Sequence, residues 1–102
     1  MRFPFIGIDL SPIVANTRII VDVCRRQGIE PAGVTKGFCG DPKIAKAMLA
    51  GGVSMLADAR VQNLQRLRRA GITAPLLLLR VPMQSQIKEV IRLADYCVVS
   101  EI

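Results

Sequence analysis

A chain of 102 residues is long enough for one domain or for part of a larger one, and its 51% hydrophobic content excludes a disordered polypeptide. The net charge of +6 invites anionic partners, but only 4% of residues are aromatic and basic residues cluster only at Arg25-Arg26 and 66–69, so we expect solvated helix faces and no nucleic-acid site. Three widely spaced cysteines without any histidine argue against a zinc site or a disulfide framework and favour a reducing cytoplasm, and no apolar run is long enough to span a membrane.

The first predicted elements are a strand at 5–10 and the helix that follows it. Ser11 suits the N-cap, Pro12 suits the first turn, and Gly28 suits the left-handed position after the helix. The inward stripe of this amphipathic helix is predicted to be Ile13, Ile20, Val23 and Cys24.

Further strand and helix pairs follow at intervals of about twenty residues. The strands are predicted at 30–36, 53–57, 75–79 and 96–99, and helices begin at Asp41-Pro42, near Arg60 and around Ile87. The residues of these helices predicted to face inward are Ile44, Met48, Leu49, Val61, Leu64, Leu67, Ile87, Val90, Ile91 and Ala94. This repeat predicts an α/β fold with a parallel sheet, right-handed crossovers and helices on both faces.

Polar residues stand at or just past the carboxyl ends of the predicted strands, and they are Asp9, Lys36, Asp58, Arg80 and the pair Ser100-Glu101. Ligands bind at this rim in parallel α/β folds. About five strands would form a partial TIM-like barrel, because a closed one needs eight strands and roughly 250 residues. A fragment, an open sheet and a barrel completed by association through exposed strand edges all remain open.

Lys36 is the first candidate for chemistry. Strand alternation places Ala32, Val34 and Lys36 on one side, where apolar surroundings would favour the neutral amine. A neutral amine can attack an aldehyde cofactor or a carbonyl substrate. Spacing alone, however, favours an ordinary lysine directed to solvent.

Arg80 and Ser100 are weaker candidates. Arg80 interrupts the apolar environment at the rim, where it either binds a carboxylate or phosphate or pairs with Asp58 or Glu101. Ser100 either donates to a ligand or, more commonly for serine, caps a helix. Cys39 lacks any histidine to activate it and is interpreted as a packing residue or as a residue without a role in the site.

Three segments resemble a known family. IDLSPIVANTRII resembles the opening strand and helix of the alanine racemase type of pyridoxal 5'-phosphate (PLP) enzymes, which belong to fold type III. GVTKGFCGDPKIAKAMLAGGVSMLADARVQNLQRLRRAGI and LLLLRVPM are similar to the ornithine racemase and alanine-ornithine racemase branch. The resemblance covers essentially all of residues 1–102.

The resemblance implies a PLP-dependent amino-acid racemase in which Lys36 forms the internal aldimine and is one of two catalytic bases. It implies the N-terminal portion of a PLP-binding barrel, with the rest of the barrel and a β-rich domain absent from this chain. It further implies a homodimer whose second base is a tyrosine of the partner, and ornithine or a related basic amino acid as substrate. Arg80 and Ser100 match rim positions that contact cofactor or substrate. The chain alone is expected to be an inactive fragment.

One departure and two alternatives accompany the resemblance. Better-known alanine racemases have a phosphate-contacting tyrosine in the turn after the lysine, where this chain has Gly37-Phe38-Cys39-Gly40, which favours the ornithine branch. ADARVQNL is similar to a segment of the small, non-catalytic PLP-carrying proteins of PLP homeostasis, the first alternative. The second is a flavodoxin-like signalling module, because Asp9 and Asp58 follow the first and third predicted strands.

Overall fold

Four short parallel strands form one sheet in residues 9–98, the part of the chain that this computed structural model describes. The elements follow in the order α1 (Ser11–Arg26), β1 (Ala32–Val34), α2 (Pro42–Ala50), β2 (Met55–Asp58), α3 (Val61–Arg69), β3 (Leu76–Leu78), α4 (Ile87–Leu93) and β4 (Tyr96–Cys97). Two 3₁₀ turns, η1 (Lys36–Phe38) and η2 (Gln84–Gln86), precede α2 and α4. The predicted strands at 30–36, 53–57, 75–79 and 96–99 are therefore present but shorter, and most of the predicted strand at 5–10 lies outside the described residues.

The helix starts and stops follow local chemistry. At α1 the side chain of Asp9 accepts a hydrogen bond from the Ser11 amide at 3.0 Å, so Ser11 is the first helical residue and not the predicted cap. At α2 the predicted cap is confirmed, because the Asp41 carboxylate accepts from the Lys43 amide at 2.9 Å. Gly28, with φ 74°, takes the predicted left-handed position after α1.

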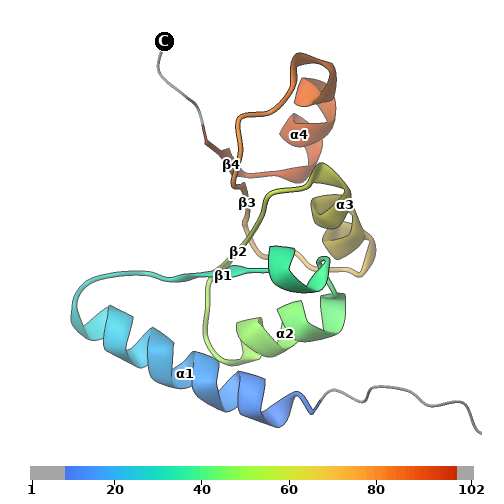
Figure 1. The fold of residues 1–102 in the computed structure, drawn as a ribbon. Helices are drawn as coiled ribbons and strands as arrows, with labels where there is room; N and C mark the ends of the chain where they lie inside the picture. The colour runs from blue at the N-terminus through green and yellow to red at the C-terminus, as the bar shows by residue number, and fades with distance from the viewer. Residues whose placement is uncertain (1–8, 99–102) are drawn as a thin grey trace, which may run out of the picture.

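The strands pair in chain order, β1-β2-β3-β4, and every pair is parallel. Figure 1 shows α2, α3 and α4 on the same side of this sheet. Right-handed crossovers that always advance in one direction place successive helices on one face, whereas helices on both faces require a reversal of strand order. The prediction that helices cover both faces is therefore wrong for the described residues.

The same topology decides against the flavodoxin-like alternative. In a flavodoxin-like sheet the second and third strands of the chain are separated by the first strand. Here the strands at those positions, β1 and β2, are direct neighbours, with Ala32 opposite Met55 and Val34 opposite Ala57. Sequential pairing with helices on one face is instead the arrangement of a barrel segment.

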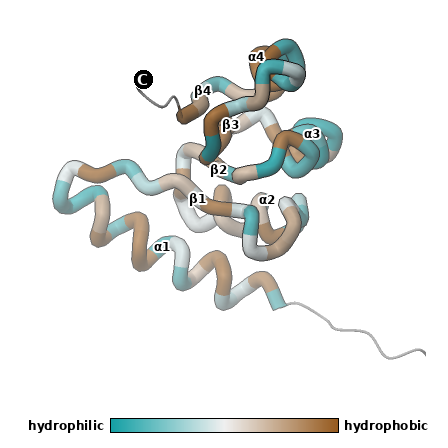
Figure 2. Tube along the Cα trace, turned by 45° about the horizontal axis from the view of Figure 1, so that its top comes forward, coloured by the Kyte–Doolittle hydropathy of each residue, from teal (hydrophilic) through white to brown (hydrophobic). Residues whose placement is uncertain are grey.

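The hydrophobic core lies between the sheet and α2 to α4. From the strands, Leu56, Leu76 and Leu78 are completely buried. The helical residues buried in or packed against this core as predicted are Ile44, Met48, Leu49, Val61, Leu64, Leu67 and Val90. In Figure 2 hydrophobic residues follow β3, whereas most of α3 is hydrophilic, so α3 contributes only its narrow inner stripe.

α1 buries only part of its predicted stripe, because Ile13 and Cys24 are half-buried but the other two residues are not. Ile20 is 58% exposed and Val23 55% exposed, while Val21 is buried. Figure 1 shows α1 against α2 and away from the strands. The contact is tight, because a Cβ added to Gly51 would lie 2.5 Å from the Cβ of Thr17. α1 thus packs against the glycine end of α2, and this contact determines that the side of α1 with Thr17 and Val21 faces inward.

α4 also departs from its predicted face. Ile91 is 74% exposed and Ile87 is exposed as well. The helix buries Val90 and Leu93, and Ala94 follows it in extended backbone, half-buried against the core. Periodicity shows that α4 is amphipathic. Which of its side chains besides Val90 are buried depends on how the helix is placed over β3 and β4.

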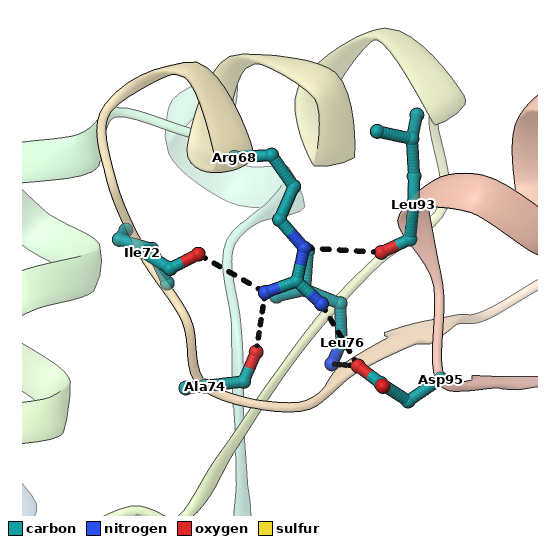
Figure 3. Close-up of polar contacts among 6 residues, drawn as sticks. All are labelled: Arg68, Ile72, Ala74, Leu76, Leu93 and Asp95. Carbon is teal, nitrogen blue, oxygen red and sulfur yellow. Dashed lines mark hydrogen bonds and ion pairs between the residues drawn. The ribbon is translucent and has the colours of Figure 1, made fainter.

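Arg68 joins four elements at the amino ends of the strands. Its guanidinium donates to the carbonyls of Leu93, Ile72 and Ala74 at 3.2, 3.0 and 2.8 Å (Figure 3). It also forms an ion pair with Asp95 at 2.8 Å, and the same carboxylate oxygen accepts from the Leu76 amide. These contacts fix the ends of α3 and α4 to the starts of β3 and β4.

None of the helices in residues 9–98 combines the length and the apolar character needed to cross a membrane.

Candidate functional site

Lys36 is the first residue of a tight turn after β1. The strand ends at Val34, and Thr35 leaves it with φ −102° and ψ −1°. The Thr35 carbonyl then accepts hydrogen bonds from the amides of Phe38 at 3.3 Å and Gly40 at 3.0 Å, which closes the turn. Lys36 is exposed on this turn. The structure therefore presents a primary amine at the carboxyl end of a parallel strand, the end at which ligands bind.

Helix α3 supports the far side of the Lys36 turn. Cys39 and Gly40 have φ 57° and 65°, so the chain passes through two left-handed residues before α2. A Cβ at Gly40 would lie 2.8 Å from the Cβ of Asn63, so glycine is needed for this approach. The guanidinium of Arg66 donates to the Cys39 carbonyl at 3.1 Å. The turn that carries Lys36 is thus fixed by contacts with α3.

Asp58 lies at the end of β2, as predicted, but its carboxylate is buried. Oδ2 accepts from the Thr35 hydroxyl at 2.6 Å, and Oδ1 accepts from the Arg60 amide at 2.9 Å and from Asn63 Nδ2 at 3.0 Å. The interpretation of Asp58 as a partner for Arg80 is therefore wrong, because its partners are Thr35 and the start of α3. Thr35 is the residue that sequence reasoning missed. Strand alternation could have indicated it, because Thr35 stands between Val34 and Lys36 and must therefore face the opposite side of the strand, toward the core.

Arg80 lies two residues beyond β3 and lines a groove of about 430 Å³. The groove runs between the start of α3 and the loop before α4, and its lining is Ala59, Arg60, Val61, Gln62, Asn63, Arg80, Met83 and Gln86. Lys36 does not line this groove. Asn63 belongs both to the groove and to the contacts beneath the Lys36 turn, so the two places are neighbours across α3.

The rim carries cations whose charges are not neutralised by ion pairs within residues 9–98. The ion pairs found there join Arg25 to Glu30, Arg68 to Asp95 and Arg92 to Glu89. None of the three involves a cation at the rim. Lys36, Arg60 and Arg80 are exposed at the ends of β1, β2 and β3 in turn. Such a rim suits a phosphate or a carboxylate ligand.

The face of the sheet opposite the helices is apolar and partly exposed. Strand register places Val34, Ala57, Leu77 and Tyr96 in one row across it. Val34 is 41% exposed and Tyr96 55% exposed. The apolar surroundings predicted for Lys36 are thus not closed in the described residues, because Val34 stays exposed on this face and β1 ends before Lys36.

The other predicted rim residues give little to the described site. Ser100 and Glu101 lie outside the described residues. The Asp9 carboxylate accepts from the Ser11 amide just before α1, and the exposed Cys39 contributes its carbonyl and its left-handed backbone. No group of three potential metal-ligating side chains occurs within residues 9–98.

Comparison with known proteins places this geometry in a family. The profile of "Alanine racemase, N-terminal domain" matches residues 8–102. A lysine racemase of Thermotoga maritima is 40% identical over 101 residues, which are 99% of this chain and 28% of that protein. An ornithine racemase of Acetoanaerobium sticklandii is 32% identical over 100 residues, 98% of this chain and 28% of that protein.

A solved structure agrees with the sequence comparisons. The crystal structure of alanine racemase from E. faecalis superposes with a TM-score of 0.76 at 28% identity, covering 90% of this chain and 25% of that one. The chain thus spans little more than a quarter of the length of the racemases that it matches. With strands paired in order, helices on one face and an exposed lysine after β1, the chain belongs to the alanine racemase N-terminal domain family.

Proposed function

We propose that the chain is part of a PLP-dependent racemase that acts on ornithine or a related basic amino acid such as lysine. The observation that carries this proposal is the 40% identity to a lysine racemase across 99% of the chain. The similarity to an ornithine racemase supports the same substrate class. Because the chain spans 28% of either relative, racemisation is proposed for the whole protein and not for these residues alone.

The described residues fit PLP in their chemistry. PLP is an aromatic aldehyde that carries a phosphate, so it needs an amine, an apolar surface and a cation. Lys36 offers an exposed primary amine at the carboxyl end of β1, and Val34 begins the apolar row on the face of the sheet opposite the helices. Arg80 offers a guanidinium without an ion pair in the described region. We propose Lys36, Arg80 and Ser100 as the cofactor contacts contributed by this chain.

Each residue has a defined task in the proposed reaction. When bound, PLP withdraws electrons from the Cα of an attached amino acid, so that the Cα proton can leave. Lys36 would hold the cofactor through its Nζ atom, and as a free amine it would carry a proton to or from the substrate Cα on one face. Arg80 neutralises a phosphate or carboxylate charge. The opposite face requires a second base, which we propose comes from the partner subunit of a homodimer.

The test uses the protein expressed from its complete gene. Incubation with PLP followed by borohydride reduction is expected to add one cofactor mass to the peptide that contains Lys36. Lys36→Ala is expected to remove the label, whereas Lys43→Ala, which changes an exposed lysine at the start of α2, should keep it. Labelling at another lysine would refute the assigned role.

Chiral chromatography then tests the reaction and its substrate. L-ornithine and L-lysine are expected to racemise, and L-alanine is expected to racemise more slowly. Labelling of Lys36 without racemisation of any of the three would instead support the non-catalytic PLP-carrying alternative. Light scattering and cell fractionation test the accompanying proposal of a cytoplasmic homodimer.

A further inference from the structure

Two polar side chains are completely buried within residues 9–98, and they are hydrogen-bonded to each other. Thr35 and Asp58 both have no exposed surface. The distance from Thr35 Oγ1 to Asp58 Oδ2 is 2.6 Å, the length of a hydrogen bond to a charged acceptor. A buried carboxylate is costly unless its oxygens are satisfied, so this pair calls for an explanation beyond packing.

The carboxylate of Asp58 is anchored from the side of α3. Its Oδ1 atom accepts from the Arg60 amide at 2.9 Å and from Asn63 Nδ2 at 3.0 Å. These donors belong to the N-cap and the first turn of α3. The contacts with α3 therefore hold the Asp58 carboxylate in place without any help from Thr35. The carboxylate is a rigid acceptor for the threonine hydroxyl.

Thr35 connects the fixed carboxylate of Asp58 to the turn that carries Lys36. Its amide donates to the Ala57 carbonyl at 2.8 Å, which ties it to β2. Its carbonyl accepts from the Phe38 and Gly40 amides and so closes the turn. Thr35 is also the residue directly before Lys36. Every hydrogen-bonding group of Thr35 is thus used, and the bond from its hydroxyl to Asp58 fixes the rotation of the residue from which Lys36 departs.

We propose that Thr35 and Asp58 are positioning residues that hold Lys36 in its reactive orientation, an inference that rests on the proposed function of Lys36. Neither residue lines the groove with Arg80, and both act through the backbone of the turn. A misplacement of about 1 Å in a reacting group can cost about a hundredfold in rate. The hydroxyl of Thr35, and not merely a side chain of its volume, is the group that the reactivity of Lys36 requires.

Two variants of Thr35 separate the hydroxyl from the packing. Thr35→Val keeps the branched shape and removes the hydroxyl, whereas Thr35→Ser keeps the hydroxyl and removes the methyl group. In the protein from the complete gene, the rate of borohydride-trapped PLP attachment at Lys36 is expected to fall about 10- to 100-fold in Thr35→Val. It should stay within about threefold of the parent protein in Thr35→Ser, which is the rescue that a purely structural role would not give.

A variant at the opposite end of the sheet controls for lost stability. Asp95→Asn weakens the ion pair with Arg68 and is expected to lower the thermal midpoint without slowing attachment at Lys36. Amide hydrogen exchange gives a readout that needs no cofactor. The amides of Phe38 and Gly40 are expected to exchange faster in Thr35→Val but not in Asp95→Asn.

The outcomes are distinguishable. Equal attachment rates in Thr35→Val and Thr35→Ser, whether fast or slow, would overturn the positioning role while leaving Lys36 as the proposed cofactor lysine. A slow Asp95→Asn variant would overturn it too, because general destabilisation would then explain the effect. If the parent protein is not labelled at Lys36 at all, the proposed function fails, and the positioning role fails with it.

Discussion

The two ends of the sheet use the same type of residue in opposite ways. At the amino ends of the strands, Arg68 donates to three carbonyls and one carboxylate, and its side chain is 25% exposed. At the carboxyl ends, Arg80 is exposed beside a groove and has no ion pair with a described residue. Arg68 uses four of its five N–H donors within the fold, whereas Arg80 presents its charge to solvent.

This difference separates stability from ligand binding. In barrels built from parallel strands, ligands bind at the carboxyl end and the amino end stabilises the fold. Substitutions at the Arg68 end should therefore change unfolding and leave the chemistry intact, and substitutions at the Lys36 end should do the reverse. Four predictions test this separation in the protein from the complete gene.

The largest effect is expected from Lys36→Ala. Loss of the amine that would bind PLP and carry a proton should lower racemisation by at least about a thousandfold. The thermal midpoint without cofactor should be unchanged, because Lys36 is exposed and makes no ion pair in residues 9–98. Chiral chromatography and a thermal melt measure the two quantities, and a large fall in the melting temperature would contradict the separation.

Arg68→Met should give the largest change in stability of the four. The substitution keeps the aliphatic part of the side chain and leaves the carbonyls of Ile72, Ala74 and Leu93 without their donor. We expect the free energy of unfolding to fall by about 3 kcal/mol. Urea titration measures this change. Attachment of PLP at Lys36 should remain as fast as in the parent protein below the unfolding transition, and a parallel loss of attachment would show that the two ends are coupled.

Arg80→Met should weaken binding without destabilising the fold. A hydrogen bond to a charged ligand group contributes about 1.5 kcal/mol or more, so the Kd for PLP or the KM for the amino acid should rise about tenfold. Arg92→Met is the matched control, because Arg92 is exposed on α4 and pairs only with the nearby Glu89 among described residues. Equal effects of the two substitutions would indicate a general loss of charge.

The smallest effect is expected from the exposed pair of Arg25 and Glu30. The hydrogen bond from Arg25 lowers the pKa of Glu30 below its usual 4.5. A lowered folded-state pKa means that the contribution of Glu30 to stability is complete above pH 4.5 and is lost as the pH falls through the lower folded value. Thermal melts should show a small deficit for Glu30→Gln near pH 7 that shrinks in acid. A deficit that grows in acid would contradict this assignment.

Local signals in the sequence predicted most of the elements. The Asp41 cap and the glycine after α1 act over a few residues, so their chemistry is readable from the sequence. The inward faces were less readable, because Ile20 and Ile91 lie on apolar stripes that no described element covers. An apolar stripe shows that a helix is amphipathic, but its burial depends on which neighbour the topology supplies.

Sequence reasoning located the residues of the site that stand at strand ends but not the contacts beneath them. Lys36 and Arg80 were found because strand ends can be located along the chain, and the structure puts both at the carboxyl edge of the sheet. The bond between Thr35 and Asp58 joins residues that are 23 apart and depends on the pairing of β1 with β2. No pattern within one segment carries that information, so the support beneath Lys36 became visible only in three dimensions.

Helix α3 contacts both ends of the sheet, and this restricts its length. Asn63 and Arg66 support the Lys36 turn near its start, and Arg68 holds the opposite edge near its end. Inserting one residue between Arg66 and Arg68 would rotate the later side chain by about 100° relative to the earlier ones. The helix could then keep one set of contacts but not the other. Insertions and deletions should therefore be tolerated in the loops that flank α3 and rejected inside it.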